Sequence, residues 1–249
     1  MERKIKVGAV SYLNTKPLLY GLQHGPIKDE IELILDYPAR LVDMLKTGAI
    51  DIGLVPVGAL PELGEYHIVS DYCIGTEGEV ASVAVFSQVP MEEIETVILD
   101  YQSRTSVKLC KLLFDKHWKR AVRFIDATND DYIDEIKSTT AGLIIGDRAL
   151  SYRGKSNYIY DLGLGWKEMT GLPFVFAVWV SSKNLDTKFI KSFSDSTALG
   201  LLNLDEIKQD NSFSSYDLDV YYSKNISYML SEEKRKGLEQ FLKNIFVNL

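Results

Sequence analysis

The order of predicted strands and helices in the N-terminal part of the chain recurs farther along, and this repeat limits the possible folds. Each stretch reads as strand, polar turn, helix, strand, helix and strand. The predicted strands are at residues 5–10, 31–35 and 50–55 in the first stretch, and at 97–99, 122–125 and 142–145 in the second. Apolar strands that alternate with amphipathic helices are typical of sheets with crossover helices. Each stretch therefore predicts a small, mostly parallel sheet flanked by helices.

Helix start and stop residues support this assignment. Pro38 is suited to the first turn of a helix, where no amide donor is needed, and Gly48 marks the end of that helix. Asn129 or Asp130 is expected to cap a helix in the second stretch. The chain after the second stretch is expected to be mainly helical.

Two longer apolar runs, at residues 80–86 and 174–180, lie before and after the second stretch. Each run fits a long strand that crosses between two lobes. We therefore expect a two-lobed α/β fold, with lobe one at residues 1–86 plus 178–249 and lobe two at residues 87–177. Two lobes joined twice enclose a cleft, which is a preferred place for a ligand. The alternative is one continuous sheet in which both runs are central strands.

Composition narrows the classes of partner. The 249 residues are 46% hydrophobic and 25% charged, with a formal net charge of −7 and no basic cluster, so no nucleic-acid partner is expected. No apolar stretch approaches the length of a membrane span, and the N-terminus lacks the features of a signal peptide, which favours a cytoplasmic protein. Cys73 and Cys110 are isolated and fit reduced thiols. No metal-ligand spacing and no phosphate-binding loop occurs, so we expect neither a metal nor a cofactor.

The turn after the first strand, Ser11-Tyr12-Leu13-Asn14-Thr15-Lys16-Pro17, is the first candidate site. Asn14 and Thr15 are good helix N-cap residues, and Pro17 suits the first helical turn. Helix N-termini carry unpaired N–H groups and a partial positive charge, so they bind carboxylates and phosphates. A strand that leads into such a turn is a typical ligand-site layout in α/β sheets.

Other polar residues follow or precede predicted strands in the same way. Asn14, Ser82, Thr105 and Ser106 can donate hydrogen bonds to carboxylates, and Arg104 can pair with one through two parallel bonds. Three of these residues also have a purely structural interpretation. Thr105 and Ser106 fit simple helix caps, and Arg104 fits a surface ion pair.

Asp147, at the end of the last strand of the second stretch, is a further candidate, with helix capping as its structural alternative. The three histidines, His24, His67 and His117, lie in loop-like or charged contexts outside the polar clusters. A histidine base is therefore not expected.

Taken together in their order along the chain, these segments resemble the chorismate dehydratase family, whose members open the futalosine route to menaquinone. The motifs that carry the resemblance are Ser11-Tyr12-Leu13-Asn14-Thr15-x-Pro17, Cys73-Ile74-Gly75, Val80-Ala81-Ser82-Val83, Ser103-Arg104-Thr105-Ser106, Ile145-Gly146-Asp147-x-Ala149-Leu150, Asp161-Leu162-Gly163 with Trp166, and Thr170-Gly171-Leu172-Pro173-Phe174-Val175-Phe176-Ala177-Val178-Trp179. The segment Val57-Gly58 departs from the family, because a more polar turn is expected there.

The resemblance implies the two-lobed fold of type II periplasmic binding proteins without secretion, and dehydration of chorismate to 3-[(1-carboxyvinyl)oxy]benzoate without a cofactor. It implies catalytic roles for Asn14, Ser82 and Asp147. It also implies substrate contacts from Ser11, Asn14, Ser82, Arg104, Thr105 and Ser106. A monomer or a homodimer is expected, with chorismate as the small-molecule partner.

The base that removes the proton from carbon is left open at this point. Asp147 and Glu77 are the protein candidates, and the enolpyruvyl carboxylate of the substrate is the third and favoured one. Two other functions compete with the dehydratase. One is a cytosolic carboxylate-binding protein of the same fold without chemistry. The other is the related dihydroxynaphthoate synthase, which is expected to use a histidine base that this chain lacks.

Overall fold

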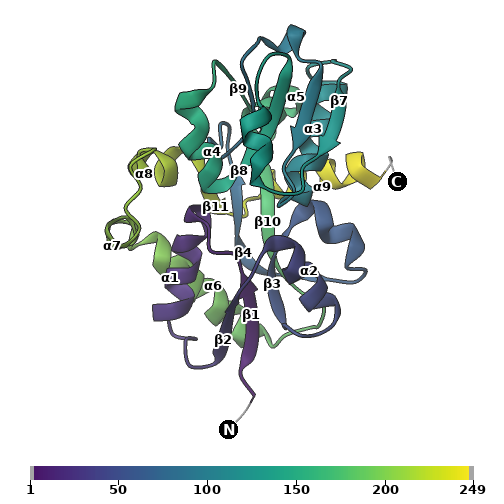
Figure 1. Ribbon diagram of the computed structural model, residues 1–249. Helices are drawn as coiled ribbons and strands as arrows, with labels where there is room; N and C mark the ends of the chain where they lie inside the picture. Colours follow the sequence, from purple (N-terminus) through teal and green to yellow (C-terminus); the bar gives the residue numbers. More distant parts are fainter. Residues whose placement is uncertain (1–2, 247–249) are drawn as a thin grey trace.

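The computed structural model describes residues 3–246. Within these residues the strands form two separate mixed sheets, one of six strands and one of five (Figure 1). The six-stranded sheet has the order β11 (Ser227–Met229), β4 (His67–Thr76), β10 (Phe174–Ser181), β3 (Ile52–Pro56), β1 (Ile5–Ala9) and β2 (Ile31–Leu35). The five-stranded sheet has the order β7 (Arg123–Asp126), β6 (Thr96–Leu99), β8 (Thr140–Ile145), β5 (Val83–Ser87) and β9 (Tyr158–Asp161). We call the first sheet with its helices lobe one and the second sheet with its helices lobe two.

Helices flank both sheets, as Figure 1 shows. The α-helices are α1 (Lys16–His24), α2 (Pro38–Lys46), α3 (Arg104–Lys116), α4 (Gly146–Tyr152), α5 (Leu162–Thr170), α6 (Thr187–Leu201), α7 (Leu204–Asp210), α8 (Leu218–Val220) and α9 (Glu232–Phe246). The 3-10 helices are η1 (Leu13–Thr15), η2 (Val57–Glu62), η3 (Met91–Glu93), η4 (Asp130–Glu135) and η5 (Arg153–Lys155), and η6 (Tyr221–Asn225) is a π-helical turn. Within residues 3–246, no helix is both long and apolar enough to span a bilayer.

The expectation of two α/β lobes is confirmed, but the sheets are mixed rather than mostly parallel. In lobe one, β1 pairs in parallel with β2 and β3, whereas β10 runs antiparallel to β3 and β4. In lobe two, β6 pairs in parallel with β7 and β8, whereas β5 runs antiparallel to β8 and β9. The reason lies in the crossings. Each strand that enters a lobe from the other lobe starts at the interlobe side, whereas β1, β3, β6 and β8 end there.

The expected boundaries at 86/87 and 177/178 fall inside β5 and β10, and each of these strands belongs to a single sheet. Neither apolar run is therefore a strand that crosses between lobes. The two sheets share no hydrogen-bonded ladder. The chain passes between the lobes at residues 77–82 and 171–173, which form neither helix nor strand. Residues 1–2 and 247–249, which the expected lobe one included, lie outside the described residues.

The buried apolar side chains of both lobes form one continuous cluster, which includes Val7 of β1, Val97 of β6 and Trp179 of β10. A second, smaller cluster around Phe86 and Ile144 lies in lobe two. In lobe one, α1 and α6 pack closely, and a Cβ on Gly200 would lie 1.6 Å from the carbonyl oxygen of Pro17. A glycine is therefore required at this helix contact, which fixes α1 and the η1 turn that precedes it.

Candidate functional site

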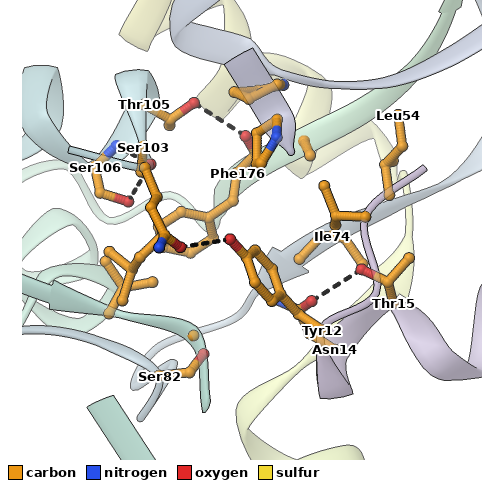
Figure 2. A pocket seen from close by; sticks show the side chains of 18 of the residues that line it. Tyr12, Asn14, Thr15, Leu54, Ile74, Ser82, Ser103, Thr105, Ser106 and Phe176 are labelled. Atoms are coloured by element: carbon orange, nitrogen blue, oxygen red, sulfur yellow. Dashed lines mark hydrogen bonds between the residues drawn. The ribbon is translucent and has the colours of Figure 1, made fainter. Parts of the chain in front are cut away.

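A cavity lies between the lobes, where strand ends and helix starts from both sheets meet (Figure 2). The empty space between its walls is about 630 Å³, with the open solvent at its mouth included. The polar side chains on its wall come from Tyr12, Asn14, Thr15, Ser82, Gln102, Ser103, Thr105 and Ser106. The rest of the wall is mainly apolar and includes Leu54, Ile74, Ile145 and Phe176. Within the described residues, no Asp, Glu, Lys, Arg or His side chain belongs to this wall.

Asn14 stands in η1, immediately before α1, and two tyrosines from the C-terminal part of the chain hold this turn. Tyr228 donates a hydrogen bond to the carbonyl oxygen of Asn14 at 2.9 Å, and Tyr222 donates one to the carbonyl of Leu13 at 2.9 Å. The side-chain oxygen of Asn14 accepts from the Thr15 hydroxyl at 3.0 Å. That contact occupies the acceptor end of the Asn14 amide, so its NH₂ group is the end available to donate to a ligand.

Ser82 stands on a strained turn in the first crossing between the lobes. The amide of Ser82 donates to the carbonyl of Val80 at 2.7 Å, and the residue between them, Ala81, has φ +61°. Such a γ-turn with a positive φ is rare for a residue with a side chain, and strain of this kind concentrates at functional sites. The carbonyl of Ser82 accepts from the amide of Gly146 at 2.7 Å, so lobe two also fixes its main chain.

A carboxylate of lobe two holds the strained turn in place. Asp161, at the end of β9, accepts from the amides of Val80 at 3.1 Å and Ala81 at 2.8 Å, and it also caps α5 through the amide of Leu164 at 3.0 Å. Burial raises the pKa of Asp161 to about 6, although the three backbone N–H groups lower it. The signal for this role lay in the motif Asp161-Leu162-Gly163, but sequence reasoning assigned it no function.

The start of α3 brings three hydroxyls to the lobe-two side of the cavity. Ser103 is the actual N-cap, since its Oγ accepts from the amide of Ser106 at 3.0 Å. The Ser103 hydroxyl also donates to Ser106 Oγ at 2.8 Å. Because Ser106 is the acceptor in this contact, its own proton remains available to the cavity. The N-terminus of α3, a helix of 13 residues, also faces the cavity and favours negative charge.

Thr105 lines the cavity and also makes two hydrogen bonds to lobe one. Its hydroxyl donates to the carbonyl of Phe176 at 3.1 Å and accepts from the amide of Gly58 at 3.0 Å. Thr105 therefore links lobe two to lobe one. Because its hydroxyl proton is donated to Phe176, that proton is not available to a ligand. The departure at Val57-Gly58 has a steric reason, because a Cβ on Gly58 would lie 2.8 Å from the Cα of Thr105.

Sequence reasoning missed Tyr12 and Gln102 as residues of the site. Tyr12 of lobe one, labelled in Figure 2, donates to Gln102 Oε1 of lobe two at 2.7 Å, so the two lobes are joined at the cavity wall. Burial raises the pKa of Tyr12 to about 12, so its phenol stays protonated. Both residues lay in polar turns already recognised from the sequence, but no local pattern indicated that those two turns meet.

Three expected site residues lie off the cavity wall. Ser11 is exposed, accepts from Lys16 Nζ at 3.2 Å, and lines a neighbouring surface recess instead. Arg104 forms an ion pair with Glu62. Asp147 accepts from the amide of Leu13 at 3.1 Å, which links α4 to η1 across the lobes, and burial raises its pKa.

Glu77 and the histidines also lie away from the cavity wall. Glu77 pairs with Lys234 at 3.3 Å, and Lys234 is fully buried between α9 and β11. The ring of His24 contacts the carbonyl of Tyr20, and His67 and His117 each lie beside a glutamate. None of these groups reaches the wall of the cavity.

The arrangement of two α/β lobes with a cavity between them is also found in known structures. The chain aligns with a Candida albicans protein described as having the generic periplasmic binding protein structural fold. The TM-score is 0.65 at 14% identity, and the match covers 97% of this chain and 91% of that one. At this identity the likeness establishes the fold alone.

Comparison of the sequence with known families assigns the chain to one of them. A family model described as menaquinone biosynthesis matches residues 5–246, so the chain belongs to that family. A chorismate dehydratase of Thermus thermophilus is 26% identical in an alignment 262 positions long, and the match covers 96% of this chain and 94% of that protein. A chorismate dehydratase of Campylobacter jejuni is 28% identical over 169 residues, which cover 64% of this chain and 73% of that protein.

Proposed function

We propose that this chain is a cytoplasmic chorismate dehydratase, a lyase that removes water from chorismate to give 3-[(1-carboxyvinyl)oxy]benzoate for menaquinone synthesis by the futalosine route. The family membership and the names of both relatives support this reading. The site supports it chemically, because a dianion with two carboxylates and a hydroxyl needs several donors. Asn14, Ser82 and Ser106 provide such donors around a largely apolar cavity.

The composition of the cavity wall is the observation that carries the mechanism. No carboxylate or imidazole stands on it among the described residues, and its one titratable group, the Tyr12 phenol, has a pKa raised to about 12. A general base must reach the proton that it removes, either directly or through one water. The enolpyruvyl carboxylate of the substrate is attached at C3, beside the proton to be lost. We therefore assign the role of base to the substrate itself.

The reaction balances without a cofactor. The C3 proton passes to the side-chain carboxylate, and the electrons of the C3–H bond form the new ring double bond. The C4–O bond breaks, and the side-chain carboxylate passes the proton that it took from C3 to the leaving hydroxyl, which departs as water. The aromatic ring that results drives the step, while the protein orients the substrate and hydrogen-bonds the departing oxygen.

Roles for the individual residues follow from their positions. Asn14 and Ser82 orient the substrate from lobe one and the crossing, and Ser106 with the α3 N-terminus binds a carboxylate from lobe two. Asp147 acts as a link between the lobes rather than as the base, because its carboxylate is directed at the amide of Leu13. Thr105 and Arg104 act structurally, through Phe176 and Glu62.

The test is to mix the purified protein with chorismate and to follow ultraviolet absorbance and product mass. We expect a product that is one water lighter than chorismate. Ser82→Ala and Asn14→Ala each remove a charge-assisted hydrogen bond of roughly 1.5–3 kcal/mol, so kcat/KM is expected to fall at least about tenfold. Ser212→Ala, at an exposed serine outside the cavity, is the matched control.

Binding of chorismate without turnover would instead identify a carboxylate-binding protein of the same fold. Turnover of the substrate of dihydroxynaphthoate synthase, with none of chorismate, would identify that enzyme. The absence of a histidine from the described cavity wall argues against this last outcome.

A further inference from the structure

Ser82 has one strong side-chain partner, the phenol of Tyr221, and that partner lies behind the cavity wall. The Tyr221 hydroxyl donates to Ser82 Oγ at 2.9 Å. Tyr221 is fully buried and is not itself part of the wall, whereas Ser82 is. The phenol therefore reaches the site only through the serine.

This contact decides which way the Ser82 hydroxyl points. A serine hydroxyl has one proton to donate and two lone pairs that accept. The Tyr221 proton occupies one lone pair of Ser82 Oγ, so the serine must donate its own proton elsewhere. The other acceptor within reach is the carbonyl of Val80, at a long 3.5 Å, which leaves the proton free for a ligand in the cavity.

Tyr221 is itself rigidly placed. It begins the π-helical turn η6, its amide donates to the carbonyl of Asp217 at 2.9 Å, and its carbonyl accepts from the amide of Ile226 at 3.0 Å. Its ring packs on that of Tyr222 with centroids 5.5 Å apart. Single π-turns are rare and often mark functional sites. Burial also raises the pKa of Tyr221, so the phenol keeps its proton.

We propose that Tyr221 is a positioning residue that holds the Ser82 hydroxyl as an obligate hydrogen-bond donor to an oxygen of the ligand. The inference rests on the proposed function, in which that oxygen belongs to chorismate. Ser82 touches the substrate, and Tyr221 acts only through Ser82. Without the phenol, the serine proton is free to rotate, and Ser82 offers its lone pairs to the substrate as often as its proton.

The experiment compares Tyr221→Phe, Ser82→Ala and the double variant in turnover of chorismate. Tyr221→Phe removes one oxygen and keeps the packed ring. We expect kcat to fall about tenfold with KM changed less than about threefold, which is the loss of one hydrogen bond to a charged group in the transition state. In the Ser82→Ala background the same change is expected to alter kcat less than about twofold, because its effect passes through the serine.

Tyr216→Phe is the matched control. It removes a tyrosine hydroxyl from the same segment, but that hydroxyl bonds Asn225 Oδ1 at 3.0 Å rather than a cavity residue. A loss of kcat in Tyr216→Phe equal to that in Tyr221→Phe would overturn the inference, because it would show general loosening of the segment. Additive effects of Tyr221→Phe and Ser82→Ala would overturn it as well.

A second measurement separates failure of the inference from failure of the proposed function. Urea unfolding of the wild type, the two single variants and the double variant needs no substrate. The changes in unfolding free energy at positions 221 and 82 are expected to be non-additive. No turnover by the wild-type protein would refute the dehydratase assignment. In that case, uncoupled unfolding effects would refute the Tyr221–Ser82 inference, and coupled effects would uphold it.

Discussion

Asp161 Oδ2 lies 2.8 Å from the amide nitrogen of Ala81, the one residue between Val80 and Ser82 that adopts a positive φ, at +61°. A buried carboxylate of lobe two thus holds a strained turn at the entrance to that lobe. The turn aims Ser82 at the cavity, and strain is maintained only where the surrounding structure fixes it. The placement of Ser82 therefore depends on the contacts that Asp161 makes with Val80 and Ala81.

Asp161 is expected to make folding stability depend on pH. Its pKa in the folded protein is raised from 3.8 to about 6, so its contribution to stability is fully present below pH 3.8 and is lost as the pH rises through 6. A shift of this size corresponds to roughly 3 kcal/mol. The difference in unfolding free energy between wild type and Asp161→Asn, measured in urea from pH 4 to 8, should fall by up to that amount and then level off. A flat difference curve would contradict the prediction.

Thr105→Ala is expected to destabilise the protein rather than to act only on ligand binding. It leaves the buried amide of Gly58 and the carbonyl of Phe176 without their partner, a cost of roughly 1–3 kcal/mol in unfolding free energy. Thr105→Ser keeps the hydroxyl and should retain most of that stability. Weaker ligand binding in Thr105→Ala with unchanged unfolding free energy would instead restore Thr105 as a substrate contact.

Gly58→Ala is expected to force η2 and α3 apart. Its Cβ would lie 2.8 Å from the Cα of Thr105 and 3.0 Å from the carbonyl oxygen of Arg104, and these backbone atoms cannot move aside cheaply. Overpacking of this kind costs roughly 1–3 kcal/mol, to be measured by urea unfolding. Gly154→Ala, where a Cβ meets nothing within 4 Å, is the matched control. Equal stability of the two variants would rule out the close approach.

Asp147→Asn is expected to fold and to retain measurable turnover of chorismate. An asparagine keeps an oxygen that can accept from the amide of Leu13, so the link between α4 and η1 persists. Burial raises the pKa of Asp147, as a base would need, but its carboxylate accepts from the amide of Leu13, and Asp147 is not among the residues of the cavity wall. Complete loss of turnover with substrate binding intact would show that Asp147, and not the substrate, is the base.

Replacement of His24, His67 or His117 by glutamine should leave kcat within about twofold, because surface substitutions away from a site change free energies by less than about 0.5 kcal/mol. Each ring contacts a surface partner outside the cavity wall. Steady-state kinetics at pH 7 would test this. A large loss in one variant would point to a base that the present geometry does not place at the substrate.

The predicted strands and most of the predicted helices have close counterparts, because their signals are local. The strand at Ile31–Leu35 and the helix that begins at Pro38 follow from periodicity and a helix-start residue. The helix expected after Asn129 is instead the 3-10 helix Asp130–Glu135. Three strands, β4, β9 and β11, were not predicted. β9 and β11 span only three or four residues and gain their ladders from distant partners. β4 is ten residues long, but Ser70 and Asp71 interrupt its apolar residues, so no local pattern indicated a strand.

Sequence reasoning placed hydroxyl and amide side chains at the strand ends, and four of these, Asn14, Ser82, Thr105 and Ser106, line the cavity. It did not show that the Thr105 hydroxyl donates to the carbonyl of Phe176, or that Arg104 forms an ion pair with Glu62. The partner of a side chain depends on which elements pack beside it.

By itself, then, the sequence determined the alternation of strands and helices and the polar chemistry at their ends, since both depend on neighbouring residues. Only the tertiary structure decided how those ends meet. Tyr221 and Ser82 are 139 residues apart, and their hydrogen bond exists because the chain returns from lobe two to lobe one before it forms the η6 turn. The direction of the Ser82 proton, on which the site depends, is set by that long-range contact.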